Sequence, residues 1–355
     1  MTELLVGTRK GLFALAGEPG APFAVTARAF AGEPVEYALR DPRTGRVLAS
    51  VTSAFYGPKI WWADDVEGEW HQADGVALPE GGDAALERIW VIVAGEADGA
   101  LYAGGDPGVL FESRDGGATW GLNRSLWEDP TRPSWEPGGG GLCLHSIVPW
   151  PGDPNRLALA LSAVGVWLTE DGGTTWRHGN DGLVPRYMPE DARDGSLTLC
   201  VHDLHRAPRR PERMFMQFHG GVYRSDDAGE TWTDIGAGLP SDFGFPMAVD
   251  PADPDSAYVI PLAGDGDRVT PGGQVRVYET RDAGATWTAR GDGLPDRDAY
   301  LTVLRQAFGR AGEGPALELY FGSTSGDVFG SADAGARWFT AAAHLPPVYS
   351  VTVTR

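Results

Sequence analysis

Short apolar runs of four to seven residues recur along the whole chain, and glycine, proline, asparagine and aspartate separate them. This alternation is typical of strands joined by tight turns. Residues 144–178 show it best, with strands predicted over 144–150, 156–161, 165–169 and 175–178. Helical spacing of apolar residues is nearly absent. The pattern therefore predicts an all-β chain built from units of four strands.

An eight-residue motif, Ser/Thr-x-Asp-x-Gly-x-Thr-Trp, ends these units. It occupies residues 113–120, 169–176, 225–232, 280–287 and 331–338, and a degenerate copy lies at 63–70. The Asp and Trp of the five clear copies are Asp115, Asp171, Asp227, Asp282 and Asp333, and Trp120, Trp176, Trp232, Trp287 and Trp338. Asp followed by Gly favours a turn. We expect the Thr-Trp to begin an outgoing strand and the Trp to pack between neighbouring units.

A repeat period of about 50 residues indicates a solenoid, a propeller or an array. Seven units can be counted, and the first lacks its inner strand. The alternating C-terminal stretch 349–354 is a spare strand that could join the first unit and close a ring, which removes exposed edges. We therefore expect residues 1–355 to form a single seven-bladed β-propeller domain of four-stranded antiparallel blades, with six blades as the alternative.

The motif resembles the Asp-box, or BNR repeat, of β-propellers such as sialidases, sortilin-type receptors and photosystem assembly factors, in which it is structural. Segments such as GLCLHSIVPWPGDPNR, CVHDLHRAP and HLPPVYSVTV resemble bacterial members labelled glycosyl hydrolase or exo-α-sialidase. The resemblance implies a glycosyl hydrolase-like protein. A sialidase would also carry an Arg-Ile-Pro motif near its start, where this chain has Thr8-Arg9-Lys10-Gly11. Sialidase activity is therefore not expected, and catalysis of another kind stays open.

The formal net charge of −20 argues against nucleic acid and anionic membranes as partners. Two cysteines indicate no disulfide framework. The N-terminal residues do not read as a signal peptide, and no apolar run approaches the length of a membrane span. A cytoplasmic protein is the resulting expectation.

In a four-stranded blade, the motif turns lie on one face, and the more variable loops lie on the other, where function is expected. His145, His202 and His219 map to that face, near the channel mouth, and Arg305 could point into the channel to recognise an anion. Cys143 and Cys200 each precede a histidine by two residues, so alternation would put each Cys-His pair on one side of its strand. Further ligand-binding candidates are Tyr37, Arg88, Trp90, Arg132, Trp135, Asp242 and Tyr300.

Three functions remain open at this point. The first is a binding or hydrolytic site for a small molecule or glycan, with His145, His202, His219 and Arg305 as its central residues. The second is a non-catalytic propeller that holds a protein partner on the same face. The third is a metal-dependent enzyme, in which a transition metal is held by Cys143, His145, Cys200 and His202. The plain alternative for these cysteines and histidines is tight packing of the inner strands.

Overall fold

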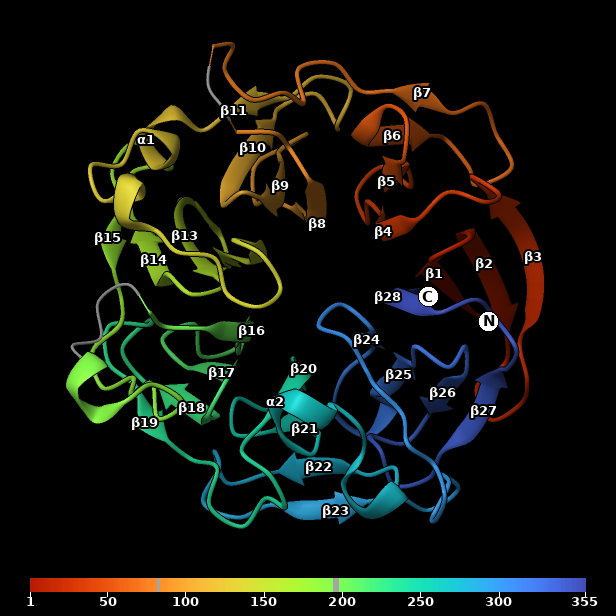
Figure 1. Cartoon of the computed structure of the whole chain (residues 1–355). Helices are drawn as coiled ribbons and strands as arrows, with labels where there is room; N and C mark the ends of the chain where they lie inside the picture. Colours follow the sequence, from red (N-terminus) through yellow and green to blue (C-terminus); the bar gives the residue numbers. More distant parts are fainter. Residues whose placement is uncertain (82–83, 194–197) are drawn as a thin grey trace.

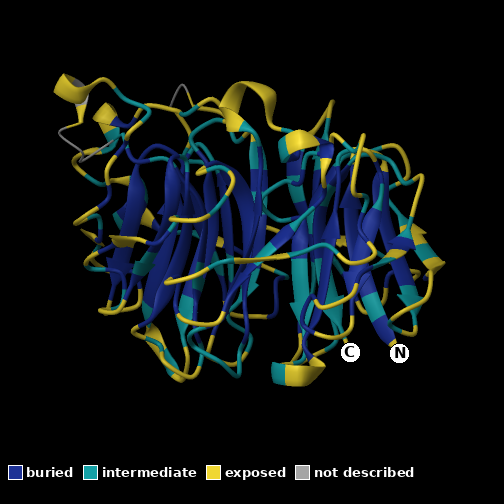
Figure 2. Cartoon of the chain, turned by 90° about the horizontal axis from the view of Figure 1, so that it is seen from below, coloured by how far each residue is buried: buried dark blue, intermediate teal, exposed yellow. Residues whose placement is uncertain are grey.

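A computed structural model describes residues 1–81, 84–193 and 198–355. Seven four-stranded antiparallel sheets stand in a ring around a common axis (Figure 1). Viewed from the side, the strands form a buried layer, and exposed loops cover both faces (Figure 2). The predicted seven-bladed β-propeller is confirmed, and the six-bladed alternative is wrong.

The blades follow the order of the chain. Blade 1 contains β1 (Thr2–Thr8), β2 (Gly11–Gly17), β3 (Ala24–Ala29) and β28 (Val348–Thr354). Blade 2 contains β4 (Val35–Arg40), β5 (Val47–Ser53), β6 (Gly57–Ala63) and β7 (His71–Gln72). Blade 3 contains β8 (Arg88–Ala94), β9 (Leu101–Asp106), β10 (Val109–Ser113) and β11 (Gly121–Leu122). Blade 4 contains β12 (Leu144–Trp150), β13 (Asp153–Leu161), β14 (Gly165–Thr169) and β15 (Arg177–His178).

The remaining three blades repeat this arrangement. Blade 5 contains β16 (Val201–Arg206), β17 (Met214–Phe218), β18 (Gly221–Ser225) and β19 (Thr233–Asp234). Blade 6 contains β20 (Gly244–Val249), β21 (Ala257–Pro261), β22 (Val277–Thr280) and β23 (Thr288–Arg290). Blade 7 contains β24 (Phe308–Ala311), β25 (Glu318–Gly322), β26 (Val328–Ser331) and β27 (Phe339–Ala342). Short helical turns in the loops are α1 (Arg124–Trp127), α2 (Gly264–Asp267), η1 (Arg132–Ser134), η2 (Glu190–Ala192), η3 (Pro271–Gly273) and η4 (Gly314–Ala316). No helix in the described part of the chain is long and apolar enough to span a membrane.

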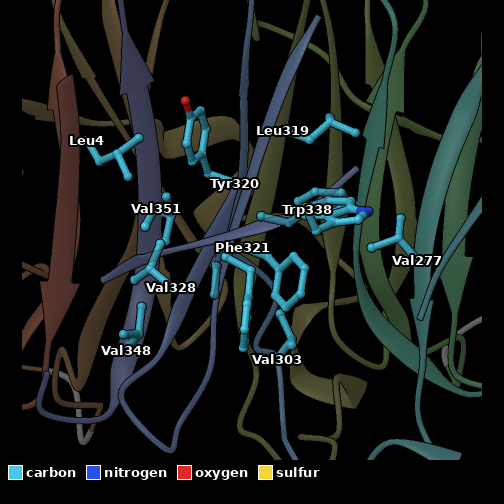
Figure 3. Packing of buried hydrophobic residues seen from close by; sticks show 14 of the residues in the cluster. Leu4, Val277, Val303, Leu319, Tyr320, Phe321, Val328, Trp338, Val348 and Val351 are labelled. Carbon is cyan, nitrogen blue, oxygen red and sulfur yellow. The ribbon is translucent and has the colours of Figure 1, made fainter. Parts of the chain in front are cut away.

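The C-terminal strand closes the ring, as the sequence predicts. β28 pairs antiparallel with β1, with Leu4 opposite Val353 and Val6 opposite Val351. A buried cluster then joins blades 6, 7 and 1, in which Leu4 and Val351 lie on the side of Tyr320, and Trp338 lies on the other side, between Phe321 and Val277 (Figure 3). Burying an apolar side chain of this size contributes about 1.5–3 kcal/mol. Packing as well as backbone pairing therefore holds the two ends of the chain together.

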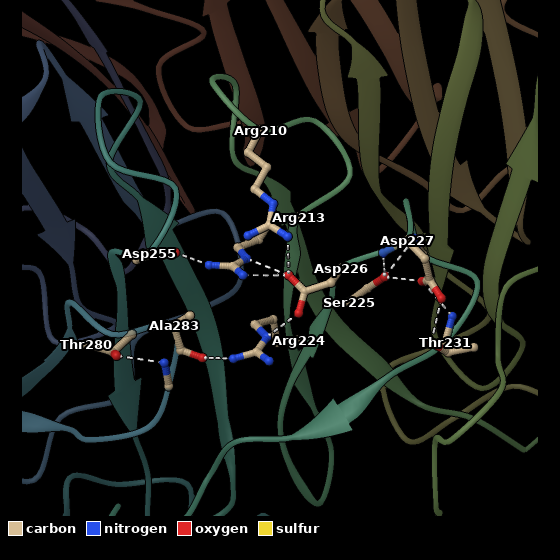
Figure 4. Close-up of polar contacts among 12 residues, drawn as sticks. Arg210, Arg213, Arg224, Ser225, Asp226, Asp227, Thr231, Asp255, Thr280 and Ala283 are labelled. Atoms are coloured by element: carbon tan, nitrogen blue, oxygen red, sulfur yellow. Dashed lines mark hydrogen bonds and ion pairs between the residues drawn. The ribbon is translucent and has the colours of Figure 1, made fainter.

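The repeated motif forms a hairpin held by its Asp carboxylate. In blade 5, Ser225 Oγ donates to Asp227 Oδ1 at 2.8 Å, and the Thr231 backbone N–H donates to the same oxygen at 2.9 Å. Thr231 Oγ1 donates to Asp227 Oδ2 at 2.6 Å (Figure 4). These bonds hold the Thr within the turn, so the outer strand begins only after the Trp, at Thr233. The expectation that Thr-Trp begins the strand is therefore wrong.

The motif Trp links neighbouring blades, as predicted. The Trp232 indole N–H donates to the Gly179 carbonyl at 2.8 Å, and Gly179 belongs to the preceding blade. The Trp287 indole bonds in the same way to Ile235, at 2.7 Å. The Trp232 backbone N–H also donates to the Asp181 carbonyl at 2.8 Å. Each hairpin thus fixes its blade to the one before it, and the rigid ring leaves the inner strands and loops to form a site.

Candidate functional site

A cavity of about 580 Å3 runs along the axis of the ring. The inner strands of blades 1 to 5 and of blade 7 supply its wall. His145 and Arg305 lie at one end, and Pro42, Pro151 and Pro208 lie at the other, in the turns that follow inner strands. Because antiparallel strands alternate in direction, those turns share a face with the repeat hairpins. The cavity therefore starts near the face opposite the repeat hairpins, where the sequence predicts the functional loops, and extends toward the hairpin face.

Six of the seven inner strands carry one extra residue close to their start. In blade 4, Leu144 pairs with Leu161 and Ser146 pairs with Ala160, so His145 has no partner across the ladder. The equivalent extra residues are Glu36, Trp90, His202, one of the pair Phe245–Pro246, and Tyr349. Such bulges redirect side chains and are common next to functional sites. The regular alternation that we assumed for Cys143–His145 and Cys200–His202 is therefore broken at both histidines.

The two bulge histidines each bond to the next blade. His145 Nε2 lies 2.9 Å from the carbonyl of Val201, which opens β16. His202 Nδ1 lies 2.6 Å from the carbonyl of Gly244, which opens β20. A carbonyl can only accept, so each of these nitrogens carries a proton. Both side chains are buried, and they act first as links between inner strands.

The second ring nitrogen distinguishes the two histidines. His145 Nδ1 lies 3.0 Å from Ser146 Oγ, so both of its nitrogens are occupied. His202 Nε2 has no hydrogen-bond partner among the described residues. Burial, followed by the nearby Arg305 guanidinium, lowers the pKa of His145 to about 3 and that of His202 well below its usual value. Both rings are therefore neutral at pH 7.

Residues 301–307, which we call the strap, directly precede β24, and Arg305 and Gln306 of this segment line the cavity. Gln306 Nε2 donates to the His145 carbonyl at 3.0 Å. The Val351 N–H donates to the Gln306 carbonyl at 2.9 Å. Blade 7, which the strap enters, stands across the ring from blade 4, which carries His145 (Figure 1). The strap therefore ties three blades together at one end of the cavity.

Arg305 projects from the strap into the cavity without a partner. Its guanidinium makes no hydrogen bond or ion pair with any described residue, and its Nε is fully buried. The guanidinium carbon lies 4.9 Å from the ring centre of Phe245 and 5.8 Å from that of Trp90. Burial lowers the pKa of Arg305, but arginine keeps its charge at neutral pH. The Nε–H is thus a buried donor without an acceptor, and such a group needs an explanation.

The cavity wall is cationic although the whole chain carries a formal net charge of −20. Arg206, Arg305 and Arg310 line it, against one carboxylate, Asp203. The Asp203 carboxylate is already engaged by Leu204 N at 2.9 Å, Met247 N at 3.0 Å and His205 Nε2 at 3.1 Å. Like Arg305, Arg310 makes no hydrogen bond with a described residue. The wall therefore offers donors for an anion and little free acceptor capacity.

The structure brings together two of the four predicted metal ligands. Potential ligand atoms of Cys200, His202 and His219 lie within 4.8 Å of one another. The Cys143 thiol instead donates to the Gly140 carbonyl at 3.0 Å. His145 has no free nitrogen, as described above. The predicted set Cys143, His145, Cys200 and His202 thus does not form the cluster, and His219 takes part in it.

Two of the predicted ligand-binding residues anchor a loop instead. Arg132 stacks on Trp127 at 3.8 Å and on Trp135 at 5.0 Å, and it donates to the carbonyls of Pro107 and Gly108. The Trp135 indole donates to Thr131 Oγ1, and its side chain is buried. These contacts occupy both side chains.

The remaining candidates lie at different distances from the cavity. Tyr37 lines it. Trp90 lies beside Arg305, and Arg88 stacks on Trp90 at 4.7 Å while approaching Glu36 at 3.4 Å. Asp242 and Tyr300 are exposed in loops, and neither lines the cavity. Sequence reasoning missed Arg206, Phe245, Gln306 and Arg310. A comparison of the seven inner strands in register could have found Arg206 and Arg310, because both lie near strand ends.

No protein-family model and no curated protein matches the chain. Solved structures do resemble it. An ancestral GH74 enzyme matches 86% of this chain at 16% identity with a TM-score of 0.58, but this chain covers only 38% of that enzyme. The match with YCF48 bound to a D1 peptide covers 90% of this chain and 84% of the YCF48 chain, at 13% identity and a TM-score of 0.54. The match with the extracellular domain of a hybrid two-component system from B. thetaiotaomicron covers 87% of this chain and 33% of that chain, at 10% identity and a TM-score of 0.53.

These identities are low, so the likeness shows the fold alone. The matched proteins are an enzyme, a peptide-bound protein and a part of a signalling system, so the shared propeller does not select one function. The site has to be interpreted from its own chemistry.

Proposed function

We propose that this protein, a propeller of the Asp-box type, binds a small organic anion in its central cavity, with Arg305 as the main recognition group. The observation that carries the proposal is the Arg305 guanidinium, which lines the cavity and has no acceptor among the described residues. A guanidinium is a planar fork that matches carboxylate and phosphate groups in bidentate geometry. An anion would supply the missing acceptors.

The size and charge of the cavity support the same conclusion. A volume of about 580 Å3 suits a small ligand rather than a polymer chain. Arg310 and Arg206 add positive charge further along the wall, and Asp203 is the one carboxylate among the described residues that line it. Trp90 and Phe245 flank the guanidinium, which orients it and reduces competition from water. Apolar residues such as Val91, Val93 and Val351 cover much of the remaining wall.

Glycoside hydrolysis fits this cavity less well. Glycosidases generally need two carboxyl groups on either side of the scissile bond. Asp203 is the one carboxylate among the described residues that line the cavity, and its oxygens already accept several hydrogen bonds. His145 is neutral and has no free ring nitrogen, so it is poorly placed as a general base. Ligand binding without hydrolysis is therefore the function that we favour.

The proposal can be tested with inorganic phosphate, citrate and glucose 6-phosphate as probes, and with neutral glucose as the control ligand. We expect at least one anion to raise the melting temperature of the protein, since a ligand that binds only the folded state stabilises it. Arg305→Met should weaken that binding by at least about tenfold, because a charge-assisted hydrogen bond contributes about 1.5–3 kcal/mol. Arg297→Met is the matched control, because Arg297 is exposed and lies outside the cavity. Absence of binding to every anion, or equal affinity in Arg305→Met, would overturn the proposal.

A further inference from the structure

We propose that Cys200, His202 and His219 form a binding site for a divalent ion of the zinc class. All three belong to blade 5. Cys200 directly precedes β16, His202 is the bulge residue of that strand, and His219 lies in the turn between β17 and β18. One thiolate and two imidazoles are a donor set that zinc accepts. This proposal does not depend on the anion site, because the two sites use different groups.

The distances permit coordination after a small movement. The three ligand atoms lie within 4.8 Å of one another. A point equidistant from three atoms at that separation lies 4.8 Å divided by √3, or about 2.8 Å, from each, whereas Zn–N and Zn–S bonds measure about 2.0–2.3 Å. Each side chain would therefore have to move inward by less than about 1 Å. Three protein ligands would leave a fourth position for water or another ligand.

Backbone bonds hold two of the ligands in register. The His219 N–H donates to the Cys200 carbonyl at 3.0 Å, which extends the β16–β17 pairing by one step. The Cys200 N–H donates to the hydroxyl oxygen of Tyr187 at 2.7 Å. The Tyr187 ring lies 4.4 Å from the His219 ring, between ring centres. Backbone hydrogen bonds thus hold Cys200 and His219 in place, and the Tyr187 ring packs beside the His219 imidazole.

The tautomer of His202 is the one that a metal ligand needs. Its Nδ1 carries a proton toward the Gly244 carbonyl at 2.6 Å, so the Nε2 lone pair is available. Histidines that bind metals generally donate their other N–H to a carbonyl or carboxylate, which fixes the ring. His145 provides an internal comparison. It occupies the same bulge position in blade 4 and makes the same link to the next blade, but Ser146 occupies its second nitrogen.

The charges around the cluster are compatible with a bound cation. Burial lowers the pKa of both His202 and His219, so the two rings are neutral ligands at pH 7. Arg305 and Arg268 lie near them and oppose a cation. A thiolate at Cys200 and the Asp265 carboxylate, whose Oδ2 lies 3.6 Å from His219 Nε2, offset this positive charge. Burial raises the pKa of the Cys200 thiol, so metal binding would release its proton.

Cobalt(II) tests the assignment, because it takes zinc sites and its bond to a thiolate produces a near-ultraviolet charge-transfer band. The metal-free full chain, kept reduced without thiols, would be titrated with Co(II) and then with Zn(II) as the competitor. We expect one equivalent of cobalt to produce the band and zinc to abolish it. Cys200→Ser should lose the band, and His219→Gln should bind cobalt at least about tenfold more weakly.

Cys143→Ser is the matched control, since Cys143 precedes β12 as Cys200 precedes β16, and it should keep the band. Arg305→Met should also keep it, which separates this site from the anion site. Circular dichroism in the presence of a chelator checks that each variant folds. If Cys200→Ser fails to fold, His219→Gln, a change in a turn, carries the test. The proposal would be overturned if the unmodified protein gave no band, or if Cys143→Ser lost the band. It would also be overturned if Cys200→Ser kept the band, or if His219→Gln bound cobalt with unchanged affinity.

Discussion

His145 should make the stability of this protein fall as the pH is lowered from 7 to 5. Burial, followed by the charge of Arg305, lowers the pKa of this side chain to about 3 in the folded protein. In the unfolded chain the pKa of histidine is about 6.5. Between these values the unfolded state binds a proton that the folded state does not. Stability is therefore complete above pH 6.5 and decreases as the pH falls toward 3.

The size of the effect follows from these two pKa values. One pH unit corresponds to about 1.4 kcal/mol for one proton, and pH 5 lies about 1.5 units below the unfolded pKa. At pH 5, His145 should therefore lower the free energy of unfolding by about 2 kcal/mol. The test is urea unfolding, followed by tryptophan fluorescence, at pH 7, 6 and 5. His145→Gln is the comparison, because its amide N–H can still donate to the Val201 carbonyl and does not titrate.

We expect the unmodified protein to lose about 2 kcal/mol more than His145→Gln between pH 7 and pH 5. His202 titrates in the same direction in both proteins, so its contribution cancels. Equal losses in the two proteins would refute the reasoning, because His145 would then be able to accept a proton without leaving its place in the fold.

Gly182→Ala should destabilise the protein more than Gly238→Ala in urea unfolding. Both glycines have positive φ angles of about 90°, but a Cβ at Gly182 would lie 2.3 Å from the Trp232 carbonyl oxygen, whereas nothing lies within 4 Å at Gly238. The backbone strain, which both substitutions cause, should cost about 1 kcal/mol, and the clash at Gly182 should cost about 1–3 kcal/mol more. Equal losses in the free energy of unfolding for the two variants would contradict the described contact. Asp171→Asn should lower the melting temperature by a few degrees at pH 7 in scanning calorimetry, because hydrogen bonds from the Thr175 side chain and other hairpin donors lower the pKa of Asp171 to about 2. This stabilisation is complete above the unfolded pKa of about 3.9 and is lost as the pH falls through about 2, so the difference between the two proteins should be smaller at pH 2 than at pH 7. A difference that persists unchanged at pH 2 would show that charge is not responsible. Arg305→Met should leave the free energy of unfolding unchanged or raise it, because the buried Nε–H without an acceptor costs about 1–3 kcal/mol and ring contacts return only about 0.5–2 kcal/mol. A loss above about 1 kcal/mol would mean that Arg305 is paired in the folded protein.

Local chemistry made much of the fold predictable from the sequence. The Asp-x-Gly turn recurs every 51–56 residues, and its hydrogen bonds involve residues at most four positions apart, such as Ser225, Asp227 and Thr231. The spare alternating strand at the C-terminus pointed to closure of the ring, and β28 provides it. Local patterns of this kind fix the number of blades and their order.

The cavity was less predictable, because it depends on register and on contacts between distant segments. A bulge at His145 or His202 changes the direction of the side chain, and a single sequence does not reveal it. Gln306 reaches a carbonyl 161 positions earlier in the chain, and residues 301–304 belong to no strand. Arg305 was suggested from sequence, but its lack of a partner could be recognised only once its neighbours were in place.

The most direct test of the central claim is a crystal structure of the protein grown with citrate or inorganic phosphate. We predict an anion in the cavity with its oxygens about 2.7–2.9 Å from the Arg305 guanidinium nitrogens, the range of charge-assisted hydrogen bonds. Occupation of the cavity by water alone, with Arg305 bonded to acceptors from the protein, would contradict the account.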